Sequence, residues 1–240
     1  MSRCFPYLLA LTLGIGSLPS FSQIQKSSPR SLVIESRRNY AKGTFPRAGS
    51  WQGLYCRGLD CEIRPARVRI KTTSAVNVLD EKELLDDLKV SGKPLALFPG
   101  GGLKEGKVVS WYRSGDPSNE SPQLGKLGKL GKWDMPWGPL PLTISWTRAP
   151  QGQKRYFVSD GSVRQFLFMI DAEAHYDGDT TPIIHWVGDL DGDGKLDLLL
   201  SIPDDNCGFD ERLYLSSGVG KGQLLRKAAQ LSGGEAACGC

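Results

Sequence analysis

Four aspartates stand close together in the second half of the chain. They belong to the segment Asp189-Leu-Asp-Gly-Asp-Gly-Lys-Leu-Asp197, which contains a single basic side chain. Carboxylates at this spacing repel one another, and their repulsion and burial destabilise a fold unless a cation neutralises them. A hard divalent ion such as calcium takes about six to eight oxygen ligands at roughly 2.3–2.6 Å. The segment therefore predicts a calcium (Ca²⁺) site.

The residue types in this segment suit different parts of such a site. Asp189, Asp191 and Asp193 alternate with other residues, so a chain that bends around an ion offers it a carboxylate at every second position. Gly194 follows the third aspartate and permits a sharp turn. We expect Lys195 to contribute its backbone carbonyl with its amine pointing away, and Asp197 to close the site. The predicted metal ligands are Asp189, Asp191, Asp193, Lys195 and Asp197.

The opening of this motif also occurs in EF-hand loops, but the rest of the segment differs from them. An EF-hand carries a glutamate at its twelfth position, where this chain has Leu200, and a helix on each side. Here the flanking segments 183–187 and 196–202 are strand-like. The segment from Gly188 to Leu200 instead resembles the FG-GAP or VCBS type of repeat, known from integrin-like β-propellers and many bacterial exported proteins.

The resemblance covers about residues 182–216. It implies that aspartates hold calcium in a loop between adjacent strands. A propeller needs several such repeats. Asp177-Gly-Asp179 is at best a fragment of a second copy, so the resemblance implies a calcium loop without a complete propeller. Asp204, Asp205 and Asn206 follow the strand and either add an oxygen ligand or form an ordinary turn.

The N-terminus has the order of a secretory signal. Arg3 precedes a short apolar stretch, and small residues at Ser20 and Ser22 fit a cleavage site. We therefore expect residues 1–22 to be a signal peptide and the mature protein to be secreted or periplasmic. We expect no membrane span, because no later segment is long and apolar enough to cross a bilayer.

Export makes disulfides the expected state of the cysteines. Cys56 and Cys61 flank a plausible hairpin turn, so a bridge across two antiparallel strands is geometrically reasonable. Cys207 would then pair with Cys238 or Cys240, and one thiol would be left over.

The apolar patterning predicts a mainly β fold, a sandwich-like or partial-propeller β domain with a few short helices. We expect a flexible basic arm over residues 23–47 and a β-rich domain over residues 48–240. The leucine spacing in 79–89 predicts a short amphipathic helix. Residues 114–141 have the composition of an exposed insertion, and residues 222–230 fit either a helix or a strand.

Charge is unevenly distributed along the chain. Residues 23–71 carry 11 lysines and arginines against 3 acids, whereas residues 160–211 carry 13 acids against 2 bases. The acidic part would repel itself, which favours a bound cation. The net charge of only +4 gives no reason to expect a nucleic-acid partner.

Three other motifs could carry chemistry, and a simpler explanation is favoured for each. Residues 101–107 have P-loop spacing, but Val108 follows where Ser or Thr is required. His175 and His185 could join Asp177 in a zinc site, although their spacing fits no familiar pattern. Trp133 and Trp137 could form a carbohydrate-binding face, but burial explains most tryptophans.

We therefore expect an exported, calcium-binding and non-enzymatic protein in which the ion rigidifies a strand-connecting loop. Its partner would be an unidentified protein or glycan at the cell surface or outside the cell. The alternative is a secreted or periplasmic hydrolase of polysaccharide or peptide with structural calcium, for which the sequence names no catalytic residues.

Overall fold

The computed structural model describes residues 32–34, 40–77, 79, 81–115, 132–171, 182–203 and 208–235. All regular elements in these ranges are strands, and the described part contains no helix. The strands are β1 (Tyr40–Ala41), β2 (Trp51–Arg57), β3 (Asp60–Pro65), β4 (Val68–Val76), β5 (Lys82–Val90), β6 (Ala96–Pro99), β7 (Gly106–Arg113), β8 (Lys132–Met135), β9 (Leu142–Arg148), β10 (Lys154–Ser159), β11 (Arg164–Ile170), β12 (Ile183–Asp189), β13 (Asp197–Ile202), β14 (Gly208–Leu215) and β15 (Arg226–Gly234). The expected mainly β fold is confirmed.

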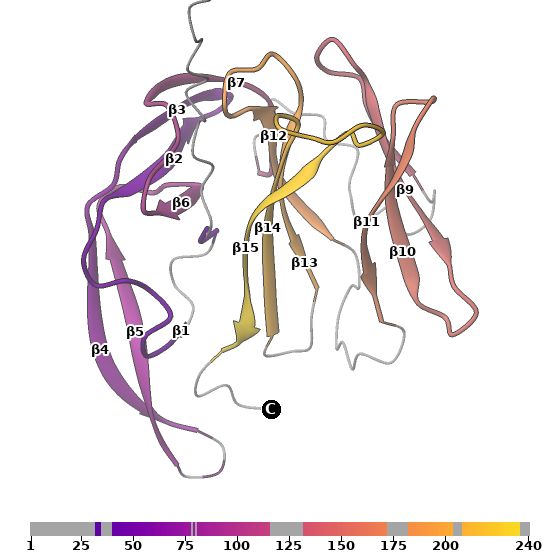
Figure 1. Cartoon of the computed structure of the whole chain (residues 1–240). Coiled ribbons are helices and arrows are strands. Elements are labelled where there is room, and N and C mark those ends of the chain that lie inside the picture. The colour runs from indigo at the N-terminus through magenta and orange to yellow at the C-terminus, as the bar shows by residue number, and fades with distance from the viewer. Residues whose placement is uncertain are drawn as a thin grey trace, which may run out of the picture.

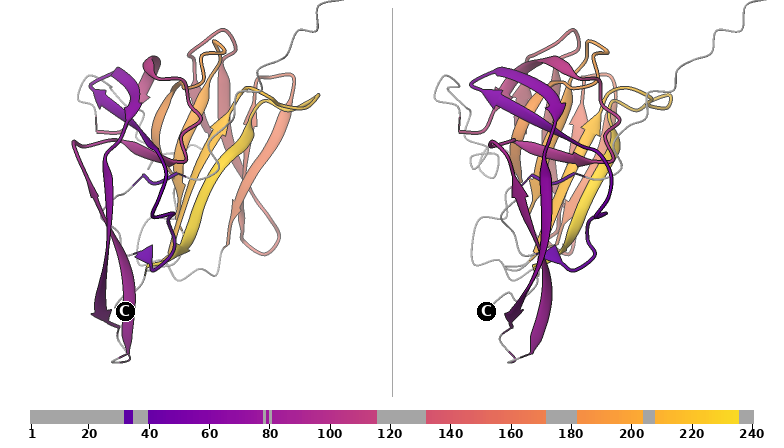
Figure 2. Two further views of the ribbon diagram at one scale, coloured as in Figure 1. Left: turned by 60° about the vertical axis from the view of Figure 1, so that its left-hand side comes forward. Right: turned by 90° about the vertical axis from the view of Figure 1, so that its left-hand side faces the viewer.

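The strands form three antiparallel sheets that curl into a half-barrel (Figure 1). The largest has eight strands in the order β15-β14-β13-β12-β7-β3-β2-β6. A four-stranded sheet, β11-β10-β9-β8, lies beside the β12–β14 part of it, and a three-stranded sheet has the order β1-β5-β4. The β4–β5 hairpin extends beyond the other strands (Figure 2).

Strand β13 of the large sheet is buried on both faces. On β13, Leu198 and Leu200 enter a core shared with Ile144 and Tyr156 of the four-stranded sheet. Leu199 points the other way, into a second core inside the curled sheet. Successive side chains of a strand point to opposite faces, so a strand covered on both sides needs a continuous apolar run. This explains the unbroken leucines after Asp197.

The expected helix over 79–89 is wrong, because residues 82–90 form β5 and pair with β4 along its whole length. Asn77 closes the connecting turn, since its Oδ1 accepts hydrogen bonds from the backbone nitrogens of Leu79 and Glu81. Leu85 and Leu88 are buried. Pairing with a neighbouring strand therefore outweighs the helix preference of a Leu, Glu and Lys-rich segment.

The expected flexible arm over residues 23–47 is described at residues 32–34 and 40–47, and apolar side chains of both stretches lie in the hydrophobic cores. Leu32 and Val33 are buried, and Val33 forms an antiparallel bridge with Leu97 of β6. The backbone nitrogen of Ile34 donates a 2.6 Å hydrogen bond to the buried carboxylate of Glu211 on β14. Further along, Tyr40 packs edge-on against Phe45, and both are buried. Buried apolar residues therefore anchor the described parts of this segment, residues 32–34 and 40–47.

The structure also describes parts of two other expected segments and one of the expected disulfides. The segment 222–230 contributes to a strand, β15, and the expected insertion includes the strand β8. The Cys56–Cys61 disulfide is confirmed and joins directly opposed residues of β2 and β3. The signal peptide and Cys207, Cys238 and Cys240 lie outside the described residues.

The two-sided burial of β13 gives a stability prediction. Leu199→Ala should lower the free energy of unfolding by about 2–5 kcal/mol, because it leaves a cavity at a fully buried position. Ile183→Ala on the paired strand is the matched control, because Ile183 is 52% exposed, and it should change stability by less than about 0.5 kcal/mol. Urea unfolding measures both. Equal losses in the two variants would show that the core is not where the structure has it.

Candidate metal centre

The aspartate segment connects two neighbouring strands, as the sequence predicts. Asp189 is the last residue of β12 and Asp197 the first of β13, and the hairpin register pairs Asp197 with Gly188. Leu190 and Leu196, at the two ends of the connection, are both buried, each in a different core. The apolar anchors therefore hold the loop ends in place while the residues between them turn back.

The loop wraps around the carboxylate of Asp189. Its Oδ1 accepts hydrogen bonds from the backbone nitrogens of Gly192 (2.8 Å) and Asp193 (3.0 Å), and its Oδ2 accepts one from Gly194 (2.9 Å). Gly192 and Gly194 have φ angles of 75° and 84°, a backbone conformation that favours glycine. The predicted role of glycine at the turn is therefore confirmed.

Asp197 is fully buried, and hydrogen bonds fix both of its carboxylate oxygens. Oδ2 accepts a 2.7 Å bond from the backbone nitrogen of Leu190, and Oδ1 accepts a 2.8 Å bond from that of Ser216. Burial raises the pKa of Asp197 to about 7. The charge of Asp191 adds to this rise, whereas the hydrogen bonds from Ser216 and Leu190 oppose it. A positive charge beside Asp197 would favour its ionised form.

Three of the predicted aspartates converge. Asp189, Asp191 and Asp197 each offer one carboxylate oxygen, and these oxygens lie within 4.8 Å of one another. Asp189 and Asp197 are buried, and Asp191 is partly buried with its Oδ1 atom shielded from solvent. Two carboxylates at strand ends and one from the loop between them could hold a metal ion, which would relieve their mutual repulsion.

Asp193 and Lys195 lie outside this group of three. Asp193 uses Oδ1 to accept a 2.9 Å hydrogen bond from the backbone nitrogen of Lys195 and a 3.1 Å bond from the hydroxyl of Ser216. Lys195 itself is exposed. Asp193 thus shapes the turn and ties it to the neighbouring loop in the structure described.

The sequence analysis missed two serines that complete the surroundings of the site. Ser216 and Ser217 follow β14, and the Ser217 hydroxyl donates a hydrogen bond to Oδ2 of Asp191. The Ser216 hydroxyl lies within hydrogen-bond distance of both Asp193 and Asp197, at 3.1 Å from an oxygen of each, and its one proton is shared between them. The pairing of β13 with β14 brings these serines to the loop, and only knowledge of that pairing would have pointed to them.

The other candidate sites gain no support. Residues 101–107 lead into strand β7, not the helix that a phosphate-binding loop requires. His185 Nε2 lies 2.8 Å from the Ser201 hydroxyl on the paired strand, which gives it a structural contact. His175 and Asp177 fall outside the described residues, as do residues 204–206.

The tryptophan pair forms no open platform. Trp133 is buried, and its ring packs edge-on against Tyr112 with ring centroids 5.5 Å apart. Trp137 is partly buried against the same core. Burial therefore accounts for Trp133, as the sequence analysis favours.

Comparison with known proteins returns no match. No protein-family model, curated protein or solved structure is significantly similar to this chain. The resemblance to FG-GAP or VCBS repeats therefore stays a prediction from the motif. The described part of the chain also holds no helix that could span a membrane.

The role of Ser216 gives a second prediction. Ser216→Ala should lower the free energy of unfolding of the metal-free protein by about 1–3 kcal/mol, because it removes the hydroxyl that hydrogen-bonds to the buried carboxylate of Asp197. Ser74→Ala, at an exposed position on β4, is the control and should be near neutral. Chemical unfolding of both variants tests this. A Ser216 variant as stable as the control would show that the hydroxyl does not support the loop.

Proposed function

We propose that this chain is an exported, non-enzymatic protein that binds one calcium ion in the β12–β13 loop. The observation that carries the proposal is the convergence of Asp189, Asp191 and Asp197 within 4.8 Å, with one of the three fully buried. The ion stabilises the loop by neutralising carboxylates that would otherwise repel one another.

The donor set supports calcium over softer metals. Every group in the cluster is a carboxylate, and oxygen ligands suit the hard cations calcium and magnesium, whereas zinc and copper favour nitrogen and sulfur. Magnesium demands a near-ideal octahedron, whereas calcium accepts irregular geometry and more ligands. An irregular loop with clustered carboxylates fits calcium better. The resemblance of residues 188–200 to FG-GAP or VCBS repeats agrees with this choice.

The ion would couple three strand ends. Asp189 ends β12, Asp197 begins β13, and the serines after β14 bind Asp191 and Asp197. An ion held by the three carboxylates therefore fixes the corner at which these adjacent strands of the large sheet meet. The proposed function is to keep that corner rigid and so maintain a surface for a protein or glycan partner.

Export is part of the proposal. The Cys56–Cys61 disulfide fits an oxidising compartment, and the N-terminal sequence has the order of a secretory signal. Calcium modules outside cells often bind with dissociation constants of about 10⁻⁴–10⁻³ M, which keeps them filled there. The alternative of a hydrolase is favoured by no specific arrangement among the described residues.

The proposal predicts calcium-dependent stability. Calcium at about 100 times the dissociation constant stabilises by about 2.7 kcal/mol, which corresponds to a rise in Tm of about 5–10 °C for a chain of this size. Asp191→Asn should nearly abolish that rise, because it removes a charge of the cluster. Asp193→Ala should reduce the rise, because Asp193 shapes the turn that carries the cluster. Differential scanning calorimetry with calcium and with chelator provides the measurement.

The control for this experiment is Asp87→Asn, which removes an aspartate paired with Lys89 on β5, outside the loop. It should keep the full calcium response. If the Asp191 variant and the control show equal shifts in Tm, the assignment of the site is rejected.

Ion selectivity gives a further prediction. Magnesium at equal concentration should raise Tm by clearly less than calcium, because magnesium demands a near-ideal octahedron and gives up its water reluctantly, whereas calcium accepts irregular geometry. Parallel thermal scans with the chloride salts compare the two ions, with sodium chloride at matched ionic strength as the control. Equal stabilisation by both ions would contradict a site suited to calcium.

A further inference from the structure

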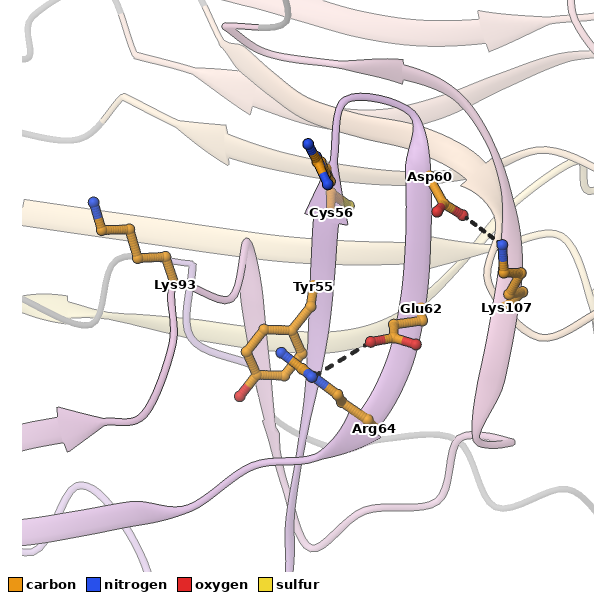
Figure 3. A pocket seen from close by; sticks show the side chains of 8 residues that line it. Tyr55, Cys56, Asp60, Glu62, Arg64, Lys93 and Lys107 are labelled. Atoms are coloured by element: carbon orange, nitrogen blue, oxygen red, sulfur yellow. Dashed lines mark hydrogen bonds and ion pairs between the residues drawn. The ribbon is translucent and has the colours of Figure 1, made fainter.

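A second feature, which shares no residue with the aspartate cluster, is a pocket at the β2–β3 hairpin (Figure 3). It has a volume of about 390 Å³, which falls in the lower range of pockets that hold small molecules. Its walls come from β2, β3, the start of β7 and Lys93, which precedes β6. The lining residues are Tyr55, Cys56, Arg57, Asp60, Glu62, Arg64, Lys93 and Lys107.

The pocket has an excess of positive charge. Two of its four cations are paired within it: Lys107 lies 3.0 Å from Asp60, and Arg64 lies 3.5 Å from Glu62. The side chains of Arg57 and Lys93 make no hydrogen bond or ion pair in the part of the chain that is described. The pocket therefore presents two uncompensated positive charges around one hollow.

The aromatic wall of the pocket is held rigidly. Tyr55 donates a hydrogen bond from its hydroxyl to the backbone oxygen of Ser91 (3.2 Å), and the Arg64 guanidinium lies 4.0 Å from the centre of its ring. A Cβ at Gly53 would come within 2.6 Å of the Tyr55 ring, and one at Gly92 within 3.1 Å. Two glycines from separate segments thus make room for this ring.

The covalent structure adds to this rigidity. The Cys56–Cys61 disulfide crosses the β2–β3 hairpin beside the pocket and ties the strand of Arg57 to the strand of Glu62. Groups held in place before binding lose less conformational freedom when a ligand arrives. The pocket is therefore pre-organised, although its lysine and arginine ends reach into solvent.

We propose that this pocket binds the oxyanion group of a small ligand, a phosphate, sulfate or carboxylate. Arg57 and Lys93 would supply the uncompensated charge, and Arg64 would add donors while it remains against Tyr55. Arginine and lysine bind such groups through charge-assisted hydrogen bonds.

This site is independent of the proposed calcium loop in composition. Strand β7 connects the two sites in the sheet. Its residue Lys107 pairs with Glu62 of β3, and its residue Val109 pairs with Asp189 of β12. No residue that lines the pocket belongs to the aspartate cluster. Failure of calcium binding would therefore leave the pocket proposal standing, and the reverse also holds.

The test is isothermal titration calorimetry of the full protein in Tris chloride without added calcium, which avoids calcium phosphate and anionic buffers. The probes are inorganic phosphate, inorganic sulfate and glucuronate, with uncharged glucose as the negative control. We expect saturable binding of at least one oxyanion and none of glucose. Tighter binding of glucuronate than of the inorganic ions would assign the ligand to acidic sugars, and the opposite order to a free oxyanion.

Arg57→Gln combined with Lys93→Gln should weaken binding about tenfold or more, since loss of a charge-assisted contact of about 1.4 kcal/mol corresponds to a factor of ten. The matched control, Arg69→Gln with Lys221→Gln, removes the same charge at exposed positions outside the pocket and should change affinity by less than about twofold at 0.15 M salt. Absence of saturable binding to every oxyanion probe, or equal affinity in the two double variants, would overturn the proposal.

Discussion

The carboxylate of Asp197 is fully buried at the beginning of β13, next to two more carboxylates. A buried charge costs several kcal/mol unless hydrogen bonds or an opposite charge offset it. Hydrogen bonds from Leu190 and Ser216 supply part of that offset, yet the pKa of Asp197 remains raised to about 7. The hydrogen bonds of the turn, the neighbouring serines and the proposed ion all offset the cost of burying these negative charges.

The fold places this constraint at a rigid position. Strands β12 and β13 are packed between two cores. The end of β12 and the start of β13, which the loop connects, therefore have little freedom to move apart. Leu190 and Leu196 belong to these cores, and the aspartates lie between or next to them. Repulsion among the carboxylates can therefore be relieved more readily by a bound cation than by opening the hairpin.

The sequence predicted the loop well because its signals are local. The alternation of aspartate and glycine, and the apolar runs on either side, specify a turn between two strands without reference to the rest of the chain. Ser216 and Ser217 were missed because β13 must first pair with β14 before they reach the loop. Local residue preference also misled at 82–90, where pairing with β4 produced a strand in place of the predicted helix. The basic pocket likewise depends on the pairing of β2, β3 and β7, which no short motif records.

The most direct test of the account is calorimetric titration of calcium into the purified protein after all metal has been stripped from it. The account predicts saturable binding of one ion per chain, with a dissociation constant no weaker than about 10⁻³ M. Absence of any binding heat up to millimolar calcium, at two temperatures so that a zero enthalpy is not mistaken for no binding, would contradict it. The aspartate cluster would then be a turn stabilised by its own hydrogen bonds alone.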